Sequence, residues 1–264
     1  MDHEAAPWSA VMIWRIILAA FLLFMLGPIL LVVLFSFGSN ALIGFPMGDL
    51  TLGWYERLAA DTGFHSAFWT SLIVALATAI LATLTGTLAA MGLMKVTPAA
   101  ARGILSALSL PVLLPPLVVA IAIVVLIVRG LGLRLGLPVV VLGHILVAQP
   151  FVILIVMARL QRFDQSAVDA ARDLGATRLE AFRLVTLPQI ASALVGAALV
   201  SAAISLDDFI IASFTIGGGN TISTFVWGKM RTTLDPSINA IATILLVLTV
   251  GLSALALRVT RYKG

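Results

Sequence analysis

Long apolar runs recur along this chain, and they constrain its fold more than any other feature. A helix that crosses a bilayer needs about 20 mainly apolar residues. Six runs meet this length, at about residues 11–36, 67–94, 103–128, 138–160, 187–212 and 237–259. Only 11% of the residues are charged and the mean hydropathy is +1.14, whereas globular domains carry about 25% charged residues. The sequence predicts an all-α integral membrane protein with six transmembrane helices in a single domain, 1–264.

Basic residues divide unequally between the two sides of such a protein. Six spans place both termini and the second and fourth loops on one side. That side holds eleven of the sixteen basic residues, namely Arg15, Lys95, Arg102, Arg159, Arg162, Arg172, Arg178, Arg183, Arg258, Arg261 and Lys263. The other side holds Arg57, Arg129, Arg134, Lys229 and Arg231. Because Lys and Arg favour cytoplasmic loops, we expect both termini and the loop 163–186 to lie in the cytoplasm.

The charge pattern argues against a nucleic-acid-binding protein, and the length of the first apolar run argues against a signal peptide. The net charge is +4, but the basic residues are scattered at span ends and form no block, so the chain gives no case for nucleic-acid binding. The first run, 11–36, is longer than the core of a signal peptide. We therefore expect it to be a retained span of the membrane domain.

The loop between the fourth and fifth runs has the local signals of two short helices. Ser166 with Asp169, and Thr177 with Glu180, have the spacing of a capping box, in which the hydroxyl and the carboxylate pair with free N–H groups of the first turn. Gly175 stands between the two pairs, where a left-handed residue would end the first helix. The sequence predicts a helix, a bend at Gly175 and a second helix.

Two features of this loop favour docking onto another protein. Ala167, Ala170, Ala171 and Leu174 form a low-profile apolar face on the first helix, and small side chains allow another surface to approach the backbone closely. Pro188 suits the first turn of a helix, so we expect the fifth span to begin there. An amphipathic helix that rests on lipid is the alternative, because basic residues favour that as well.

A spacing pattern in the same loop resembles a known family. The pattern is Asp169-Ala170-Ala171, three residues, Gly175, nine residues, Val185, one residue, then Leu187-Pro188. It is similar to the EAA loop of the permease subunits of bacterial type I ABC importers, with Asp in place of Glu and Val in place of Ile. In that family the loop is the coupling helix that sits in a groove of the ATPase subunit.

The resemblance implies the site residues and the partners. The residues implied in ATPase coupling are Ser166, Asp169, Ala170, Ala171, Gly175, Thr177, Glu180, Leu187 and Pro188. The implied assembly holds a homologous permease as the second half of a heterodimer, two ATPase subunits and an external substrate-binding protein, in the bacterial inner membrane. ATP and Mg would be bound by the ATPase subunits, with no cofactor on this chain.

Two adjacent carboxylates lie inside the fifth run. Asp207 and Asp208, followed by Phe209, stand roughly 28 Å along a helix from Pro188. Intramembrane carboxylates usually face a cavity or a partner charge, and two negative charges would attract an ammonium group. We expect the three residues to line a substrate pathway. The alternative is a pair at the outer rim that is bound to water, Lys229 or Arg231.

Further segments resemble one branch of the same family. They are Trp54-Tyr55, Ser205-Leu206-Asp207-Asp208, the loop Gly217–Asn220 and the segment Pro236–Thr243. These segments are similar to the permeases of spermidine/putrescine importers. The resemblance implies import of a small cationic solute, with another amine, an amino acid or a metal-carrying solute as alternatives.

Other polar or helix-breaking residues lie within or beside the spans. Pro115 and Pro116 remove backbone donors from the third run, which predicts a broken helix that could serve as a gate or be a simple kink. Residues 221–235 predict a short outer helix, in which Phe225 and Trp227 are either gate residues or interfacial anchors. His144 in the fourth run is either a packing residue with a satisfied ring or a proton relay.

The sequence lacks the motifs of several other function classes. The one Gly-Lys pair, Gly228-Lys229, is followed by Met230, so the chain has no phosphate-binding loop and is not expected to be an enzyme. Three dispersed histidines and no cysteine give no usual metal site. A self-sufficient secondary transporter and an intramembrane enzyme with Asp207 and Asp208 as paired acids remain the alternatives from other classes.

Overall fold

The computed structural model describes residues 8–40, 44, 46–232 and 236–261. Throughout these residues the secondary structure is helical, apart from one isolated bridge between Gly38 and Leu50. The chain divides into two compact units. One consists of Met1–Asp61 and Gly228–Leu248, and the other of Thr62–Trp227 and Thr249–Gly264.

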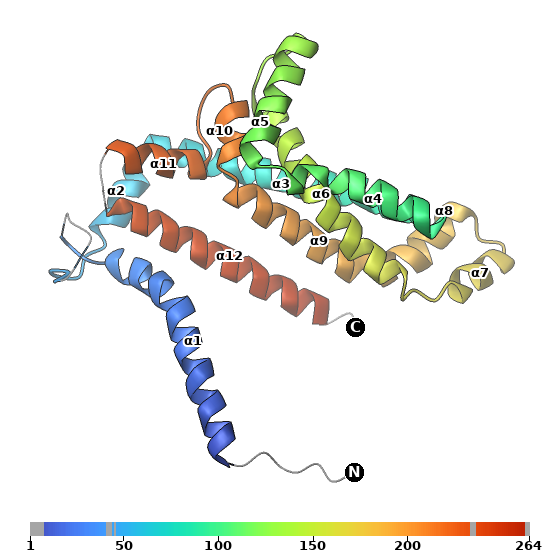
Figure 1. Cartoon of the computed structure of the whole chain (residues 1–264), viewed down its shortest axis with the longest axis horizontal. Helices are drawn as coiled ribbons and strands as arrows, with labels where there is room; N and C mark the ends of the chain where they lie inside the picture. Colours follow the sequence, from blue (N-terminus) through green and yellow to red (C-terminus); the bar gives the residue numbers. More distant parts are fainter. Residues whose placement is uncertain (1–7, 41–43, 45, 233–235, 262–264) are drawn as a thin grey trace. The chain divides into compact units, whose positions relative to one another are not determined.

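Three long helices form the core of the larger unit: α3 (Thr62–Leu93), α6 (Leu137–Leu160) and α9 (Leu187–Asp207), which pack against one another (Figure 1). Small residues let these helices come close, as expected for helices that pack in lipid. The shared cluster consists of Ala82, Ala90, Leu93, Ala148, Val152, Ile153, Val156 and Ala197. A Cβ added at Gly86 would collide with Val152, so the contact between α3 and α6 depends on this glycine.

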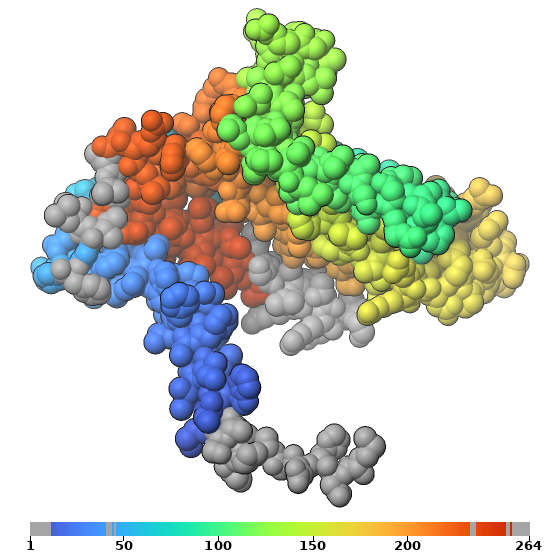
Figure 2. Space-filling view, viewed as in Figure 1, coloured from blue at the N-terminus to red at the C-terminus, as the bar shows by residue number. Residues whose placement is uncertain are grey.

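The third apolar run is broken, as its prolines predict. It forms α4 (Pro98–Leu113) and a bent continuation made of α5 (Pro116–Val124) and the π-helical turn η1 (Val125–Gly130), with 97° between the two parts. Leu114 and Pro115 are extended at the break, with ψ of 150° and 132°. In Figure 2 the light green segment of α5 and η1 projects away from the direction of α4. The apolar run 103–128 is therefore a bent pair of helices.

The fifth run differs from its prediction at both ends. The sequence predicted a second short helix and then a new span, but α8 (Arg178–Ala181) continues through the π-helical turn η2 (Phe182–Thr186) into α9. Pro188 has no N–H for the regular α-helical bond, and a wider π turn stands directly before α9. The predicted extent of 187–212 is wrong at its end, because α9 stops at Asp207 and a separate α10 (Ile210–Thr215) follows.

The smaller unit contains α1 (Trp8–Phe35), α2 (Gly53–Ala60) and the start of α12 (Ser237–Arg261). Large apolar side chains on every side of α1 are exposed, as suits a helix surrounded by lipid or by another membrane helix. Trp54 on α2 is buried, and its indole N–H donates to the carbonyl of Gly38 at 2.7 Å. The short helix predicted at 221–235 is present as α11 (Ile222–Thr232), and its last three predicted residues lie outside the described part.

The helices that could cross a membrane agree with the predicted fold class. By length and composition α1, α3, α6 and the continuous helix Arg178–Asp207 qualify, and the bent pair of α4 and α5 makes a fifth. The apolar part of α12 that is described, Ser237–Gly251, is shorter. The protein is an all-α membrane protein, while the count of six spans and the single domain over residues 1–264 stay predictions.

Candidate functional site: a two-helix loop and a break in the fifth span

The loop between α6 and α9 forms two short helices around a glycine. The first is α7 (Ser166–Asp173), and α8 is the second. Gly175 between them has φ of +91°, in the left-handed region that side chains disfavour, so the predicted bend is confirmed. A Cβ at this position would meet no atom within 4 Å. Only the backbone conformation therefore requires glycine here.

The start of α8 has the predicted capping box. Thr177 accepts the N–H of Glu180 at 3.3 Å, and the Glu180 carboxylate accepts the N–H of Thr177 at 2.8 Å. These hydrogen bonds from Thr177, first its backbone N–H and then its hydroxyl, lower the pKa of Glu180. The box fixes the direction in which the chain leaves Gly175.

The start of α7 does not have the predicted capping box. Ser166 is already inside the helix, and its hydroxyl and N–H both donate to the Asp164 carboxylate, at 2.7 and 3.0 Å. Both bonds lower the pKa of Asp164, and the bond from the Ser166 hydroxyl has the larger effect. The pairing of Ser166 with Asp169 was therefore wrong. An Asp two residues before a Ser is a turn signal, and it could have identified Asp164.

The surface of the loop is apolar at its tip. The side chain of Leu174 is 90% exposed, Leu179 is 64% exposed, and Asp169 and Ala170 of the predicted coupling set are also exposed. At the base of the loop the Arg159 side chain donates to the carbonyl of Gln189 at 2.9 Å, which ties the end of α6 to the start of α9. The loop thus presents an apolar tip on a fixed base.

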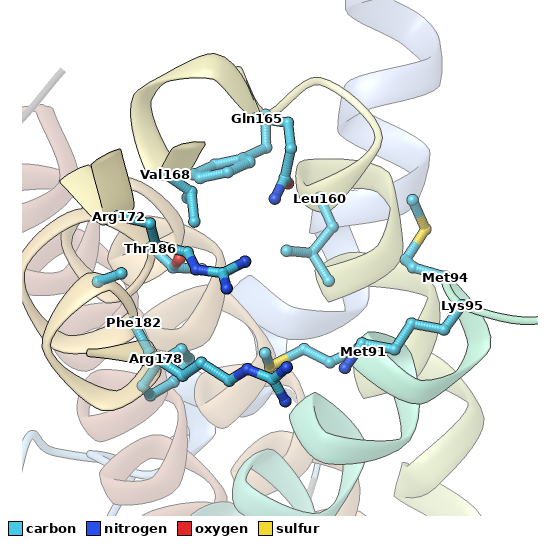
Figure 3. Close-up of a pocket in the computed structure, with 12 residues that line it drawn as sticks. Met91, Met94, Lys95, Leu160, Gln165, Val168, Arg172, Arg178, Phe182 and Thr186 are labelled. Carbon is cyan, nitrogen blue, oxygen red and sulfur yellow. The ribbon is translucent and has the colours of Figure 1, made fainter. Parts of the chain in front are cut away.

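A pocket of about 590 Å³ lies between this loop and the ends of the long helices (Figure 3). Its lining residues are Met91, Met94, Lys95, Leu160, Phe163, Gln165, Val168, Arg172, Arg178, Ala181, Phe182 and Thr186. The side chains of Lys95, Arg172 and Arg178 are directed into it. The sequence contained no signal that would bring these three residues together.

The break between α9 and α10 holds a second cluster. The buried ring of His144 on α6 contacts the Ser205 hydroxyl through Nδ1 at 2.7 Å, and its Nε2 lies 3.4 Å from Oδ1 of Asp208. The same Asp208 oxygen accepts the N–H of Ala212 at 3.0 Å, which satisfies one of the free donors of the first turn of α10. His144 on α6 therefore lies between Ser205 near the end of α9 and Asp208 just before α10.

Asp207 and Phe209, on either side of Asp208, have surroundings that differ from those of Asp208. Asp207 is exposed, whereas Asp208 is 17% exposed. Phe209 packs on Trp227 of α11 with ring centroids 5.1 Å apart, and the Ser223 hydroxyl of α11 donates to the carbonyl of Leu206 at 2.9 Å. The structure thus brings together the predicted pathway residue Phe209 and the predicted gate residue Trp227, beside the exposed carboxylate of Asp207.

The other predicted gate residues lie apart from this pair. Phe225 lies 6.4 Å from Phe64 of α3, measured between ring centroids. Pro115 and Pro116 stand at the bend before α5, which packs on α10 through Ile123 and Ile211, among others. A gating role for the four residues stays a prediction. Within the described part of the chain, no three His, Cys, Asp or Glu side chains gather in a way that could hold a metal ion.

Membrane-length helices and an exposed two-helix loop between the fourth and fifth apolar runs define an all-α membrane protein, and comparison with known proteins shows its family. Residues 82–262 match the family described as "Binding-protein-dependent transport system inner membrane component". The chain belongs to this family, whose members are transport permeases and not enzymes.

Relatives with related sequences are polyamine permeases. The chain is 32% identical over 241 residues to the putrescine transport system permease protein PotI of Escherichia coli K12, which covers 88% of this chain and 85% of that protein. It is 31% identical over 235 residues to the spermidine/putrescine permease PotC of Haemophilus influenzae, with 89% and 91% covered.

Solved structures of similar shape are ABC transporters. A bacterial transporter for import of the acidic polysaccharide alginate has a chain with a TM-score of 0.72 and 15% identity, covering 97% of this chain and 96% of that one. The MetNI methionine transporter gives a TM-score of 0.61 at 16% identity, with 81% and 100% covered. At these identities the likeness shows the fold alone, which is that of ABC importer permeases.

Proposed function

We propose that this chain is the permease subunit of an ATP-driven importer that moves a polyamine, such as putrescine or spermidine, into the cytoplasm. The observation that carries the proposal is the break after α9. There the exposed Asp207 stands beside the aromatic pair Phe209 and Trp227. A carboxylate attracts an ammonium group, and aromatic faces attract cations as well. The relatives named for putrescine and spermidine support the same solute class.

The two-helix loop would couple this site to ATP hydrolysis. The helix from Arg178 to Asp207 is continuous over 30 residues, a length of roughly 45 Å. A movement of α8 at one end therefore displaces Asp207 at the other. The exposed Leu174, Ala170 and Asp169 would contact an ATPase subunit, and Gly175 would fix the angle between the docked helix α7 and α8.

The complete importer would have partners that supply what this chain lacks. A second, homologous permease would complete the pore, two ATPase subunits would bind ATP and Mg in the cytoplasm, and an external binding protein would deliver the solute. Both termini and the loop 163–186 would face the cytoplasm, because eleven of the sixteen basic residues then lie on that side.

Transport by the reconstituted assembly tests the proposal. The chain would be expressed with the permease, ATPase and binding-protein subunits encoded beside it and placed in proteoliposomes with ATP available to the ATPase side. We expect uptake of labelled putrescine or spermidine that requires ATP and the binding protein. Matched assemblies without the ATPase subunits serve as the control.

Two outcomes would contradict the proposal in different parts. Uptake that persists without the ATPase subunits would mean a self-sufficient secondary transporter. ATP-dependent uptake of an amino acid or of a metal-carrying solute, with none of either polyamine, would keep the importer and replace the substrate.

A further inference from the structure

Three cationic side chains from separate segments converge on the pocket beside the two-helix loop. Lys95 follows the end of α3, Arg172 lies on α7 and Arg178 begins α8. Figure 3 shows the Lys95 ammonium and both guanidinium groups directed into the same space, with the Gln165 amide at its edge. Like charges that share a pocket repel one another, so this arrangement favours an anion between them.

The chain itself supplies no such anion within the part that the structure describes. No carboxylate lines the pocket, and none of the three cations has an ion pair among the described residues. The carboxylates of Asp164 and Glu180, which lie in the same loop, accept hydrogen bonds from Ser166 and Thr177. The positive charge of the pocket is therefore open to a ligand.

Apart from Gln165 and Thr186, the rest of the lining is apolar, and it stands where membrane helices end. Met91 and Met94 lie in and just after the last turn of α3, Leu160 ends α6, and Phe182 precedes α9. A pocket that combines cations with apolar side chains at the end of three spans matches the boundary between lipid headgroups and acyl chains. The exposed tip at Leu174 does not line the pocket. An ATPase subunit docked on this tip would therefore not occupy the pocket.

We propose that this pocket binds the phosphodiester headgroup of an anionic phospholipid, with Lys95, Arg172 and Arg178 around the phosphate. Guanidinium groups match phosphate oxygens with paired hydrogen bonds, and lysine adds a compact charge. The methionines and Phe182 contact the glycerol end of the acyl chains. We expect this phospholipid in the cytoplasmic leaflet, and that part of the inference alone rests on the proposed function.

The test measures lipid binding to the full-length chain without any ATPase. The purified protein in mild detergent is titrated with phosphatidylglycerol or with phosphatidylcholine of identical acyl chains, and bound lipid is counted by native mass spectrometry. We expect tighter binding of phosphatidylglycerol. Each single change, Lys95→Gln, Arg172→Gln or Arg178→Gln, should weaken it about fivefold, and the triple variant about a hundredfold. Arg183→Gln is the matched control, because it removes a charge from an exposed side chain of the same loop that does not line the pocket.

Three outcomes would overturn the proposal. These are equal binding of the two lipids, full binding by a triple variant whose circular dichroism is unchanged, and displacement of phosphatidylglycerol by millimolar inorganic phosphate, which would make the site one for the free ion. If the triple variant does not fold, the three single variants decide. Because no ATPase is present, a negative result here leaves the proposed transport function to its own experiment.

Discussion

At the scale of single residues, two adjacent aspartates have different surroundings. Asp208 lies next to the His144 ring at 3.4 Å and accepts the N–H of Ala212, so its carboxylate is used within the protein. Asp207 is exposed and ends α9. That both carboxylates line a pathway stays a prediction, and of the two we propose Asp207 as the one that binds a cationic solute.

Replacing Asp207 by Asn should lower ATP-dependent polyamine uptake about fivefold, since a partly exposed ion pair contributes up to about 1 kcal/mol. The assembly should remain intact, because the side chain is exposed. Asp208→Asn is the comparison, and it should instead lower the thermal stability of the chain by weakening the contact to His144. Proteoliposome uptake and thermal unfolding measure the two effects. Unchanged uptake by D207N would remove Asp207 from the pathway.

The proposed role of Gly175 depends on its backbone conformation. A β-branched side chain at φ of +91° costs about 1–3 kcal/mol, so Gly175→Val should change the angle between α7 and α8. We expect ATP hydrolysis to continue while uptake falls at least about tenfold. Gly175→Asn should retain most uptake, because Asn tolerates the left-handed region and the space around the residue is open. Equal uptake by both variants would contradict the coupling role.

At the scale of helices, close packing and continuity decide what each element can do. The contacts among α3, α6 and α9 combine alanines with the larger Leu93, Val152, Ile153 and Val156. The π-helical turn at Phe182–Thr186 keeps α8 and α9 in one helix despite Pro188. A continuous helix therefore joins the loop to Asp207.

The close contact between α3 and α6 can be tested at Gly86. A methyl group there would collide with Val152, and overpacking of this kind costs about 1–3 kcal/mol. Gly86→Ala should therefore lower the midpoint of thermal unfolding in detergent by several degrees. Gly92→Ala in the same helix has open space around its Cβ and is the matched control. Equal midpoints for the two variants would mean that α3 and α6 are less tightly packed than described.

At the scale of the whole molecule, we expect the distribution of basic residues to set the orientation in the membrane. The chain has no cysteine, so single cysteines can be introduced and labelled without background. Ala176→Cys in the loop should react with a membrane-impermeant maleimide only after the cells are permeabilised, whereas Gly218→Cys in the loop after α10 should react in whole cells in which the outer membrane alone is open. The reverse pattern would place the two-helix loop outside and end the coupling proposal.

Local signals in the sequence predicted the elements whose stability depends on neighbours within one or two turns. The apolar runs indicated a membrane protein, the prolines predicted the break before α5, and Thr177, Glu180 and Gly175 predicted the cap and the bend. Where two local signals competed, the prediction failed: Asp164 took the hydroxyl of Ser166 that was assigned to Asp169.

Only the tertiary structure decided which distant residues meet. His144 and Ser205 are 61 positions apart, and Lys95 follows α3 whereas Arg178 begins α8, yet each pair shares a site. The packing of α3, α6 and α9 sets these distances, and it depends on side-chain shape along whole helices, whereas hydropathy and capping depend on a few consecutive residues. The sequence by itself thus determined the class of protein and its local turns, while the structure determined which charge is exposed and which is paired.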